Sequence, residues 1–174
     1  MSYWEGKDEV CAWIRKNFDK DSTILDMGAY DGNWHYHLPE YKNIDAVEVF
    51  RPNFENLNAL GVYRKVFYKD ARNFKYQWYD LVIFGDIVEH MLPADALEML
   101  NYAKPRCRDM IIAVPFLYKQ DAIYGNPYEV HIQDDLTDRV FEERYPGYSV
   151  LCRPREDYCY YHKKEEEKHY ELAV

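Results

Sequence analysis

The sequence predicts an α/β protein built around a doubly wound, mostly parallel sheet, and three observations support this fold class. Short apolar runs alternate with segments whose apolar residues recur at helical spacing. The run at residues 79–84 is almost wholly apolar after Asp80, which is typical of a central strand covered by helices on both faces. Each of the first four runs is followed closely by a carboxylate or a glycine, and this fold has its ligand crevice at that end of its strands.

The first part of the chain is predicted to form a helix, a strand and a glycine-rich turn. Apolar residues at four-residue spacing indicate a helix over about residues 10–18. The apolar run that follows ends in Asp26, and Gly28 and Gly32 mark a turn before a helix that begins near Asn33. Glycines let the backbone approach a ligand closely, and the free N–H groups of a helix start would face it. This turn is a candidate ligand site, although an ordinary strand-to-helix turn can contain the same glycines.

A second apolar run, residues 46–49, carries Glu48 about twenty residues after Gly28, a spacing that doubly wound nucleotide-binding sheets use. A carboxylate at this point can accept hydrogen bonds from both hydroxyls of a ribose, because it offers two acceptor oxygens. The simpler alternative is a solvated strand end. Glu48 is therefore a second candidate ligand residue.

Turn and helix signals predict the next elements. A helix is expected from Arg51 to the stop at Gly61, since proline is tolerated in a first turn and glycine commonly ends a helix. Two strands follow, at residues 65–68 and 79–84, and the second is followed by Gly85. These strands extend the predicted parallel sheet.

The second half of the chain is predicted to contain a helix at 92–105, a connection at 116–134, a helix near 135–144 and a hairpin of strands 148–152 and 158–162 that turns through 153–157. The connection is long for a compact domain and rich in tyrosine, which indicates a functional loop. Its aromatic residues Tyr118, Tyr124 and Tyr128 are candidates to line an acceptor pocket, or to pack on its rim. The charged tail from Lys163 is expected to be a solvated end.

Length and charge restrict the class of protein. A chain of 174 residues has room for one core, so we expect a single domain over residues 1–174. The formal net charge of −9 argues against a nucleic-acid partner, which would favour a basic patch. No apolar run approaches the ~20 residues of a membrane span, and no signal-peptide pattern precedes residue 20. We therefore expect a cytoplasmic protein with no membrane partner, and the sequence does not indicate its oligomeric state.

The four cysteines show neither a C-x-x-C pair nor zinc-ligand spacing. Cys152 and Cys159 could face each other across the predicted hairpin. In a reducing compartment, however, we expect them to act as small apolar residues.

Three segments resemble the motifs of class I S-adenosylmethionine-dependent methyltransferases. Residues 24–32 resemble the first motif, residues 79–91 the fourth-strand motif with its Glu-His pair, and residues 108–115 the fifth strand with its terminal proline. The similarity runs from about residue 22 to 162. It implies a seven-stranded Rossmann-like sheet with an antiparallel C-terminal hairpin, and S-adenosyl-L-methionine as the cofactor. One departure is Tyr30, which replaces the middle glycine of the first motif, where its side chain would narrow the loop or stack over the cofactor.

The resemblance also implies a set of cofactor-binding residues. Asp26 and the loop after it would contact the methionine part, Glu48 the ribose, and Asp70 and Ala71 the adenine edge, while Gly85 would direct a backbone carbonyl to the amino group. The full set is Asp26, Gly28, Tyr30, Gly32, Glu48, Asp70, Ala71 and Gly85. The ordinary alternative for Asp26 and Asp70 is an aspartate that stabilises a turn.

His131 and His90 are the candidate catalytic residues. His131 lies in the connection expected to cover the crevice, and a histidine there can act as a general base near neutral pH. His90 follows the fourth strand; both residues could instead pack and hydrogen-bond locally. His35 and His37 are two residues apart, which puts them on different faces of a helix, so we expect no metal site there or elsewhere.

The predicted function is methyl transfer from S-adenosyl-L-methionine to an unidentified small-molecule acceptor. One alternative is an NAD-dependent oxidoreductase, because Gly28 and Glu48 have a plausible dinucleotide spacing. Against it, residues 28–32 do not match G-x-G-x-x-G. Another alternative is a methyltransferase-like binding module without turnover, which Tyr30 and the short chain would favour.

Overall fold

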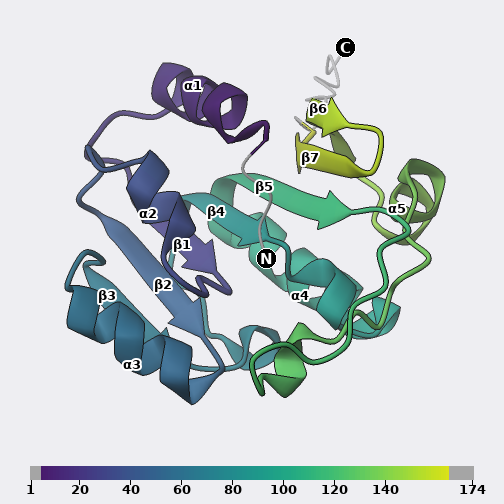
Figure 1. Ribbon diagram of the computed structural model, residues 1–174. Helices are drawn as coiled ribbons and strands as arrows, with labels where there is room; N and C mark the ends of the chain where they lie inside the picture. Colours follow the sequence, from purple (N-terminus) through teal and green to yellow (C-terminus); the bar gives the residue numbers. More distant parts are fainter. Residues whose placement is uncertain (1–4, 165–174) are drawn as a thin grey trace, which may run out of the picture.

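The computed structural model describes residues 5–164, which form one seven-stranded sheet flanked by helices (Figure 1). The strand order is β3-β2-β1-β4-β5-β7-β6; the first five strands are parallel, and β7 is antiparallel to both of its neighbours. This confirms the predicted mostly parallel sheet with an antiparallel hairpin at one edge. The helices and strands are α1 (Lys7–Asn17), β1 (Ile24–Met27), α2 (Asn33–His37), β2 (Ile44–Glu48), α3 (Arg51–Leu60), β3 (Lys65–Tyr68), β4 (Tyr79–Gly85), α4 (Pro93–Ala103), β5 (Cys107–Pro115), α5 (Asp138–Arg144), β6 (Tyr148–Arg155) and β7 (Tyr158–Lys163), with short 3-10 helices η1 (Ala71–Asn73), η2 (Val88–His90), η3 (Lys104–Arg106) and η4 (Pro127–Glu129).

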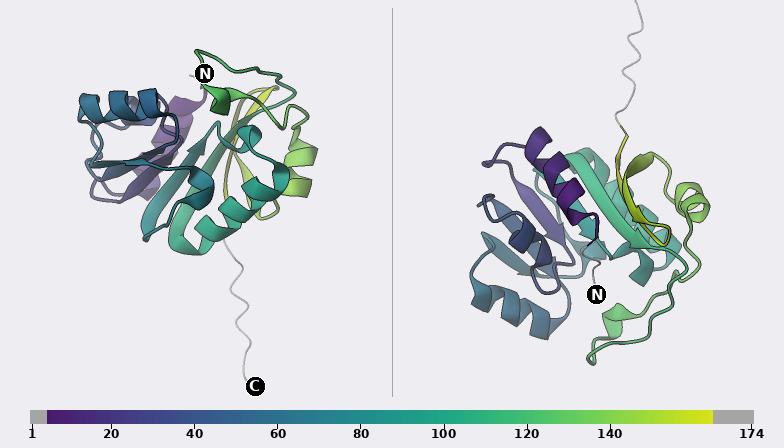
Figure 2. Two further views of the ribbon diagram at one scale, coloured as in Figure 1. Left: turned by 90° about the horizontal axis from the view of Figure 1, so that it is seen from below. Right: turned by 45° about the horizontal axis from the view of Figure 1, so that its top comes forward.

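The sheet buries both of its faces. Successive residues of a strand point to opposite faces, so Ile24 belongs to a core with Ile14 of α1 and Leu57 of α3, whereas Leu25 belongs to a second core with Leu100 of α4. The left view of Figure 2 shows α3 and α4 on opposite sides of the strands. Burial on both sides explains why β4 is apolar along nearly its whole length.

The observed helices differ from the predicted ones mainly at their ends. Helix α3 begins at Arg51 and is followed by Gly61 at φ 64°, as predicted. Helix α5 begins at Asp138, three residues later than predicted, because the Thr137 hydroxyl caps it and accepts a hydrogen bond from the Val140 N–H at 3.2 Å. No helix in residues 5–164 combines the length and apolar character needed to cross a membrane.

The C-terminal hairpin is longer than predicted, and its turn is shorter. β6 continues to Arg155 and β7 begins at Tyr158, so only two residues form the turn. β6 can contain Pro154 because it is an edge strand, where a missing N–H does not break a ladder.

The register of the hairpin pairs Cys152 with Tyr160, not with Cys159, and the four cysteines are free thiols. Lys163 belongs to β7 and is not part of a solvated tail, which corrects that prediction. The rest of the predicted tail, residues 165–174, lies outside the described residues.

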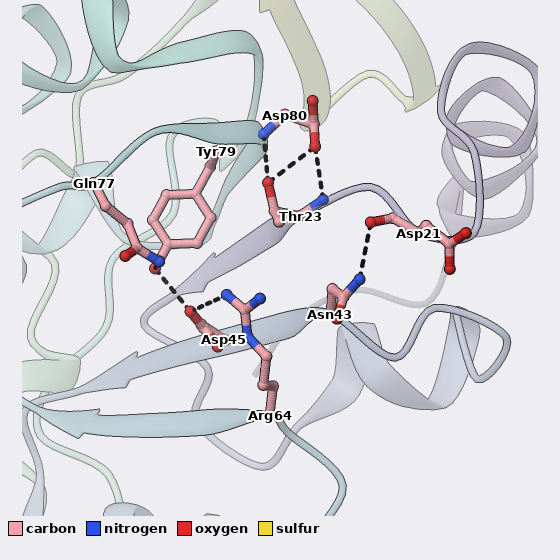
Figure 3. Close-up of polar contacts among 8 residues, drawn as sticks. All are labelled: Asp21, Thr23, Asn43, Asp45, Arg64, Gln77, Tyr79 and Asp80. Carbon is pink, nitrogen blue, oxygen red and sulfur yellow. Dashed lines mark hydrogen bonds and ion pairs between the residues drawn. The ribbon is translucent and has the colours of Figure 1, made fainter.

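A polar network joins the strands at the end of the sheet where β1, β2 and β4 begin (Figure 3). The buried Asp45 carboxylate accepts two hydrogen bonds from the Arg64 guanidinium, at 2.8 and 2.7 Å, and one from the Tyr79 hydroxyl at 2.9 Å. The Asp80 carboxylate accepts hydrogen bonds from the N–H and the hydroxyl of Thr23 at 2.8 and 2.9 Å. These contacts link β2 and β4 across β1, which lies between them.

We predict that Tyr79→Phe lowers the free energy of unfolding by about 1.5–3 kcal/mol, because the Asp45 carboxylate loses a hydrogen bond inside the protein. The matched control is Tyr76→Phe, since the buried Tyr76 hydroxyl has no hydrogen-bond partner among the described residues. This control should be neutral or stabilising. Urea unfolding of the two variants measures the difference, and equal effects would contradict the role given to the network.

Candidate functional site

A cavity of about 310 Å³ lies at the carboxyl ends of β1, β2, β4 and β5. Its volume is at the lower end of the range for small-molecule sites. The connection at 116–134, green in Figure 1, passes over this end of the sheet, to which the arrowheads of β1 and β2 point. The predicted site residues that line the cavity are Gly28, Tyr30, Glu48, Asp70, Ala71, Gly85, His90 and His131, whereas Asp26 and Gly32 lie outside its lining.

The first loop keeps a glycine-like path although a tyrosine replaces the usual middle glycine. Gly28 has φ 74°, and a Cβ on it would lie 3.0 Å from Cδ1 of Ile87. Tyr30 adopts φ 50°, the left-handed conformation that glycine reaches at little cost. Its N–H donates to Oε2 of Glu48 at 2.9 Å, so the backbone at this position is used to hold the neighbouring carboxylate.

Glu48 is fixed at the end of β2 by two backbone donors. Its Oε1 accepts from the Phe50 N–H at 2.7 Å, and its Oε2 accepts from the Tyr30 N–H at 2.9 Å. Burial raises the pKa of Glu48 to about 7, although the backbone hydrogen bonds act in the opposite direction. Each oxygen retains a second lone pair, so the carboxylate can still accept hydrogen bonds from a ligand in the cavity.

Asp26 supports the first loop from inside the protein. Its Oδ2 accepts a hydrogen bond from the Tyr63 hydroxyl at 2.6 Å. Burial raises the pKa of Asp26 to about 7, against the opposing effects of the Tyr63 hydrogen bond and the positive charge of Lys7. Gly32 has φ 84° and precedes the first residue of α2. These two residues are placed to shape the loop, and direct contact with a ligand stays a prediction for both.

Asp70 and Ala71 form the far side of the cavity. The Asp70 carboxylate accepts from the Arg72 N–H at 2.9 Å and pairs with the Arg72 guanidinium at 2.5 Å, which holds the pKa of Asp70 below its usual value. Gly85 ends β4, and a Cβ there would lie 2.7 Å from Nε1 of Trp34. Only glycine at this position lets the end of β4 lie so close to the Trp34 side chain of α2.

The connection at 116–134 brings His131 against His90. The two rings meet edge to face with centroids 4.7 Å apart. Nδ1 of His90 lies 3.1 Å from the Val130 carbonyl oxygen, and Nδ1 of His131 lies 2.7 Å from that of Tyr118. Because a carbonyl oxygen only accepts, each Nδ1 carries a proton, and Nε2 of each neutral ring keeps a free lone pair. Burial lowers the pKa of both histidines, which favours the neutral rings.

Gln133 fastens this connection to η2 and to the α5 region, and sequence reasoning missed it. Its side-chain amide donates to the Val88 carbonyl at 2.8 Å, and its backbone N–H donates to the Glu89 carbonyl at 2.9 Å. Its Oε1 accepts from Arg144 and Tyr145 of the α5 region at 3.0 and 2.8 Å. No sequence pattern marks a lone glutamine for such a role, because its partners are distant in the chain.

Glu89 is a second residue that sequence reasoning left without a role, although it belongs to the recognised Glu-His pair. Its side chain is 1% exposed, and neither carboxylate oxygen has a hydrogen-bond partner within residues 5–164. Burial raises the pKa of Glu89 well above its ordinary value. One of its oxygens and one nitrogen each of His90 and His131 lie within 4.8 Å of one another. His35 and His37 do not line the cavity.

The predicted aromatic lining of the connection is present in part. Tyr118 and Tyr128 line the cavity, and the Tyr118 ring meets the His131 ring with centroids 5.3 Å apart. Tyr124 lies outside the lining and is 79% exposed.

Solved structures of methyltransferases share this fold. A S-adenosylmethionine-dependent methyltransferase from Clostridium acetobutylicum ATCC 824 is 12% identical, with a TM-score of 0.71 over 95% of this chain and 93% of that chain. The N-terminal domain of EvdMO1 with SAH bound is 13% identical, with a TM-score of 0.69 over 95% and 83% of the two chains. Magnesium protoporphyrin IX methyltransferase from Synechocystis PCC 6803 with bound SAM is 14% identical, with a TM-score of 0.57 over 91% and 78%. The chain therefore has the fold of class I methyltransferases.

No protein-family model matches the sequence, and neither does any curated protein. The similarity to methyltransferases is therefore found in the structure and shows the fold alone.

We predict that Asp26 makes the stability of the ligand-free protein depend on pH. Its pKa of about 7 in the folded protein exceeds the ordinary value of 3.8, so the folded state binds a proton that the unfolded state has lost. The contribution of this proton to the free energy of unfolding is complete below about pH 4 and is lost as the pH rises through 7. Asp26→Asn keeps an acceptor for Tyr63 and should reduce this pH-dependent loss in the free energy of unfolding by roughly a few kcal/mol.

Urea unfolding at several pH values measures the slope. In Tyr63→Phe, the loss of the donor that favours the charged carboxylate should move the fall to higher pH. Identical slopes in the wild-type protein and Asp26→Asn would contradict the prediction.

Proposed function

We propose that this protein is an S-adenosylmethionine-dependent methyltransferase that acts on a small-molecule acceptor. The observation that carries the proposal is Glu48, a carboxylate fixed at the cavity wall beside the Gly28–Tyr30 loop and at the carboxyl end of β2. This is where doubly wound folds recognise a ribose. Two of the similar proteins, the N-terminal domain of EvdMO1 and the Synechocystis enzyme, were crystallised with SAH and SAM.

The cavity has the groups needed to hold this cofactor. Glu48 would accept hydrogen bonds from the ribose hydroxyls, and Asp70 with Ala71 would contact the adenine edge. The Gly28–Tyr30 loop and Gly85, where the Trp34 side chain leaves no room for a Cβ, would border the methionine part. Once bound, S-adenosyl-L-methionine supplies an electrophilic methyl group. The Tyr30 side chain, which also lines the cavity, would pack beside the cofactor.

The acceptor would lie in the cavity under the connection at 116–134, beside the paired rings of His90 and His131. Methyl transfer is a displacement at carbon, so alignment of the acceptor supplies much of the rate. Tyr118 and Tyr128 line this side of the cavity and would orient an acceptor. The Nε2 lone pair of His131 would take a proton from it, and His90 would support this position; both roles stay predictions.

Two features support an active enzyme with a small substrate. Tyr30 replaces a glycine but keeps the left-handed backbone and donates its N–H to Glu48, so the substitution leaves the loop able to hold a ligand. The connection covers the cavity, which suits a small acceptor better than a nucleic acid, and the net charge of −9 favours the same choice. We propose that the partner is a small molecule and is neither a nucleic acid nor a membrane.

We predict that isothermal titration calorimetry detects binding of S-adenosylmethionine and S-adenosylhomocysteine, and no comparable binding of NAD. Glu48→Ala should weaken binding by about 1–3 kcal/mol, the usual cost of losing hydrogen bonds to a charged acceptor. Glu55→Ala on the exposed face of α3 is the control and should bind as the wild-type protein does. Tight NAD binding with no response to the sulfonium compound would overturn the proposed function.

We predict that His131→Ala lowers turnover by roughly 10²-fold or more, while cofactor affinity stays nearly unchanged. Labelled S-adenosylmethionine and a metabolite extract provide the assay, because the acceptor is unidentified. His35→Ala, on α2 and outside the cavity lining, is the matched histidine control. Full specific activity in folded His131→Ala protein, with only a lower melting temperature, would show that His131 packs the connection and takes no part in the reaction.

A further inference from the structure

We propose that Glu89, His90 and His131 form a binding site for a divalent transition-metal cation at the acceptor end of the cavity. Glu89 and His90 come from η2, after β4, and His131 comes from the connection at 116–134. One candidate ligand atom from each side chain lies within 4.8 Å of the others. All three residues line the same cavity.

Glu89 is the observation that points to a ligand. The residue is 1% exposed, yet within the described part of the chain neither oxygen accepts a hydrogen bond, and the side chain forms no ion pair. Burial of a carboxylate without a partner is energetically unfavourable, so such groups are normally paired, protonated or bound to a metal. Glu48, at the same end of the sheet, is held by two backbone N–H groups and has no such need.

The two histidines have the orientation typical of metal ligands. Metal-binding histidines usually donate one ring N–H to a carbonyl or carboxylate, which fixes the ring and leaves the other nitrogen for the ion. His90 makes this contact with the Val130 carbonyl and His131 with the Tyr118 carbonyl. In the proposed site, Nε2 of each ring would bind the cation as a neutral ligand.

The three side chains need only a modest movement to share one ion. Bond lengths of about 2.1 Å put neighbouring ligand atoms roughly 3–3.4 Å apart, against the present limit of 4.8 Å. The backbone around them is already fixed, because the Glu89 carbonyl accepts from the N–H groups of Ile132 and Gln133 at 2.8 and 2.9 Å. Side-chain rotation can therefore close the site.

The ligand set indicates the class of cation. Two imidazole nitrogens and one carboxylate oxygen suit Mn²⁺, Fe²⁺, Co²⁺ or Zn²⁺, whereas Ca²⁺ and Mg²⁺ prefer oxygen ligands. Asp86 and Glu129 line the same cavity and add negative charge around the site. Three protein ligands leave at least one position for a further ligand, as in catalytic zinc sites.

The use of the cation rests on the proposed function, although its binding does not. A hydroxyl acceptor at the open position would have a lowered pKa and would release its proton to water. Its oxygen then forms the bond to the methyl carbon while the carbon–sulfur bond breaks and sulfur keeps the electron pair. In this arrangement the His131 lone pair binds the cation, so the cation replaces His131 as the group that promotes proton loss.

Cobalt titration of the full-length protein, after treatment with a chelator and dialysis, tests the site. Visible absorption and calorimetry should show one Co²⁺ per chain. Glu89→Gln and His131→Ala should each weaken binding by more than tenfold, since even partners of metal ligands contribute 10–100-fold. His35→Ala is the control and should bind as the wild-type protein does. Circular dichroism of the same samples reports that each variant is folded, and S-adenosylhomocysteine binding is measured on them separately.

The outcomes separate the two proposals. Absence of Co²⁺ binding, or equal affinity in the wild-type protein and Glu89→Gln, overturns the cation site even where S-adenosylhomocysteine binds. Co²⁺ binding that depends on Glu89 and His131, in a protein that binds neither S-adenosylmethionine nor S-adenosylhomocysteine, supports the cation site and overturns the proposed function.

Discussion

The Glu48 carboxylate connects three parts of the molecule on which the cavity depends. It ends β2, accepts from the Tyr30 N–H of the first loop, and accepts from the N–H of Phe50, the residue that precedes α3. Burial of this group is unfavourable, as its raised pKa indicates, and the two backbone donors offset part of that cost. The side chain thereby sets the distance between the first loop and the start of α3. The cavity wall therefore presents a hydrogen-bond acceptor whose position is fixed before a ligand arrives. Binding then requires less ordering of side chains, which lowers its entropic cost.

Glu48 and Glu89 show how the same residue type can be used in two ways at one end of a sheet. Both are buried, both line the cavity, and burial raises the pKa of both. Glu48 has its partners within the protein, whereas the described chain offers none to the Glu89 carboxylate. An unsatisfied buried carboxylate lowers stability, and such cost is characteristic of groups kept for function. In the two proposals, Glu48 would contact the cofactor and Glu89 would hold the cation.

The sequence was most informative where structure is local. Strand β3 has the predicted bounds, and α3 begins at Arg51 and is followed by Gly61 as predicted, because turn residues and apolar periodicity act over a few neighbours. It was least informative where distant contacts decide. The late start of α5 depends on the Thr137 cap, and the short hairpin turn depends on the pairing of β6 with the sheet edge.

The same distinction applies to the candidate site. The positions of Glu48 and Gly85 at strand ends predicted that both would line the cavity, because parallel strands bring their carboxyl ends together. The motif could not show that Asp26 faces Tyr63 instead of the cavity, since that contact joins β1 to a residue 37 positions away. Nor could it show that His131 meets His90, which requires the connection to fold back over η2. An irregular connection has no periodicity from which such a return could be read.

The position of His131 depends on the connection as a whole. Its ring is held by the Tyr118 carbonyl and its backbone N–H donates to the Gln120 carbonyl at 3.0 Å, while Gln133 fastens the following residues to η2. Every one of these contacts is to a backbone group, so the ring is oriented by the path of the chain more than by neighbouring side chains. If the connection opens to admit an acceptor, the His131 ring leaves its place beside His90. Both a proton acceptor and a cation site at this position would therefore be complete only when the connection is closed, which couples the chemistry to the exclusion of water.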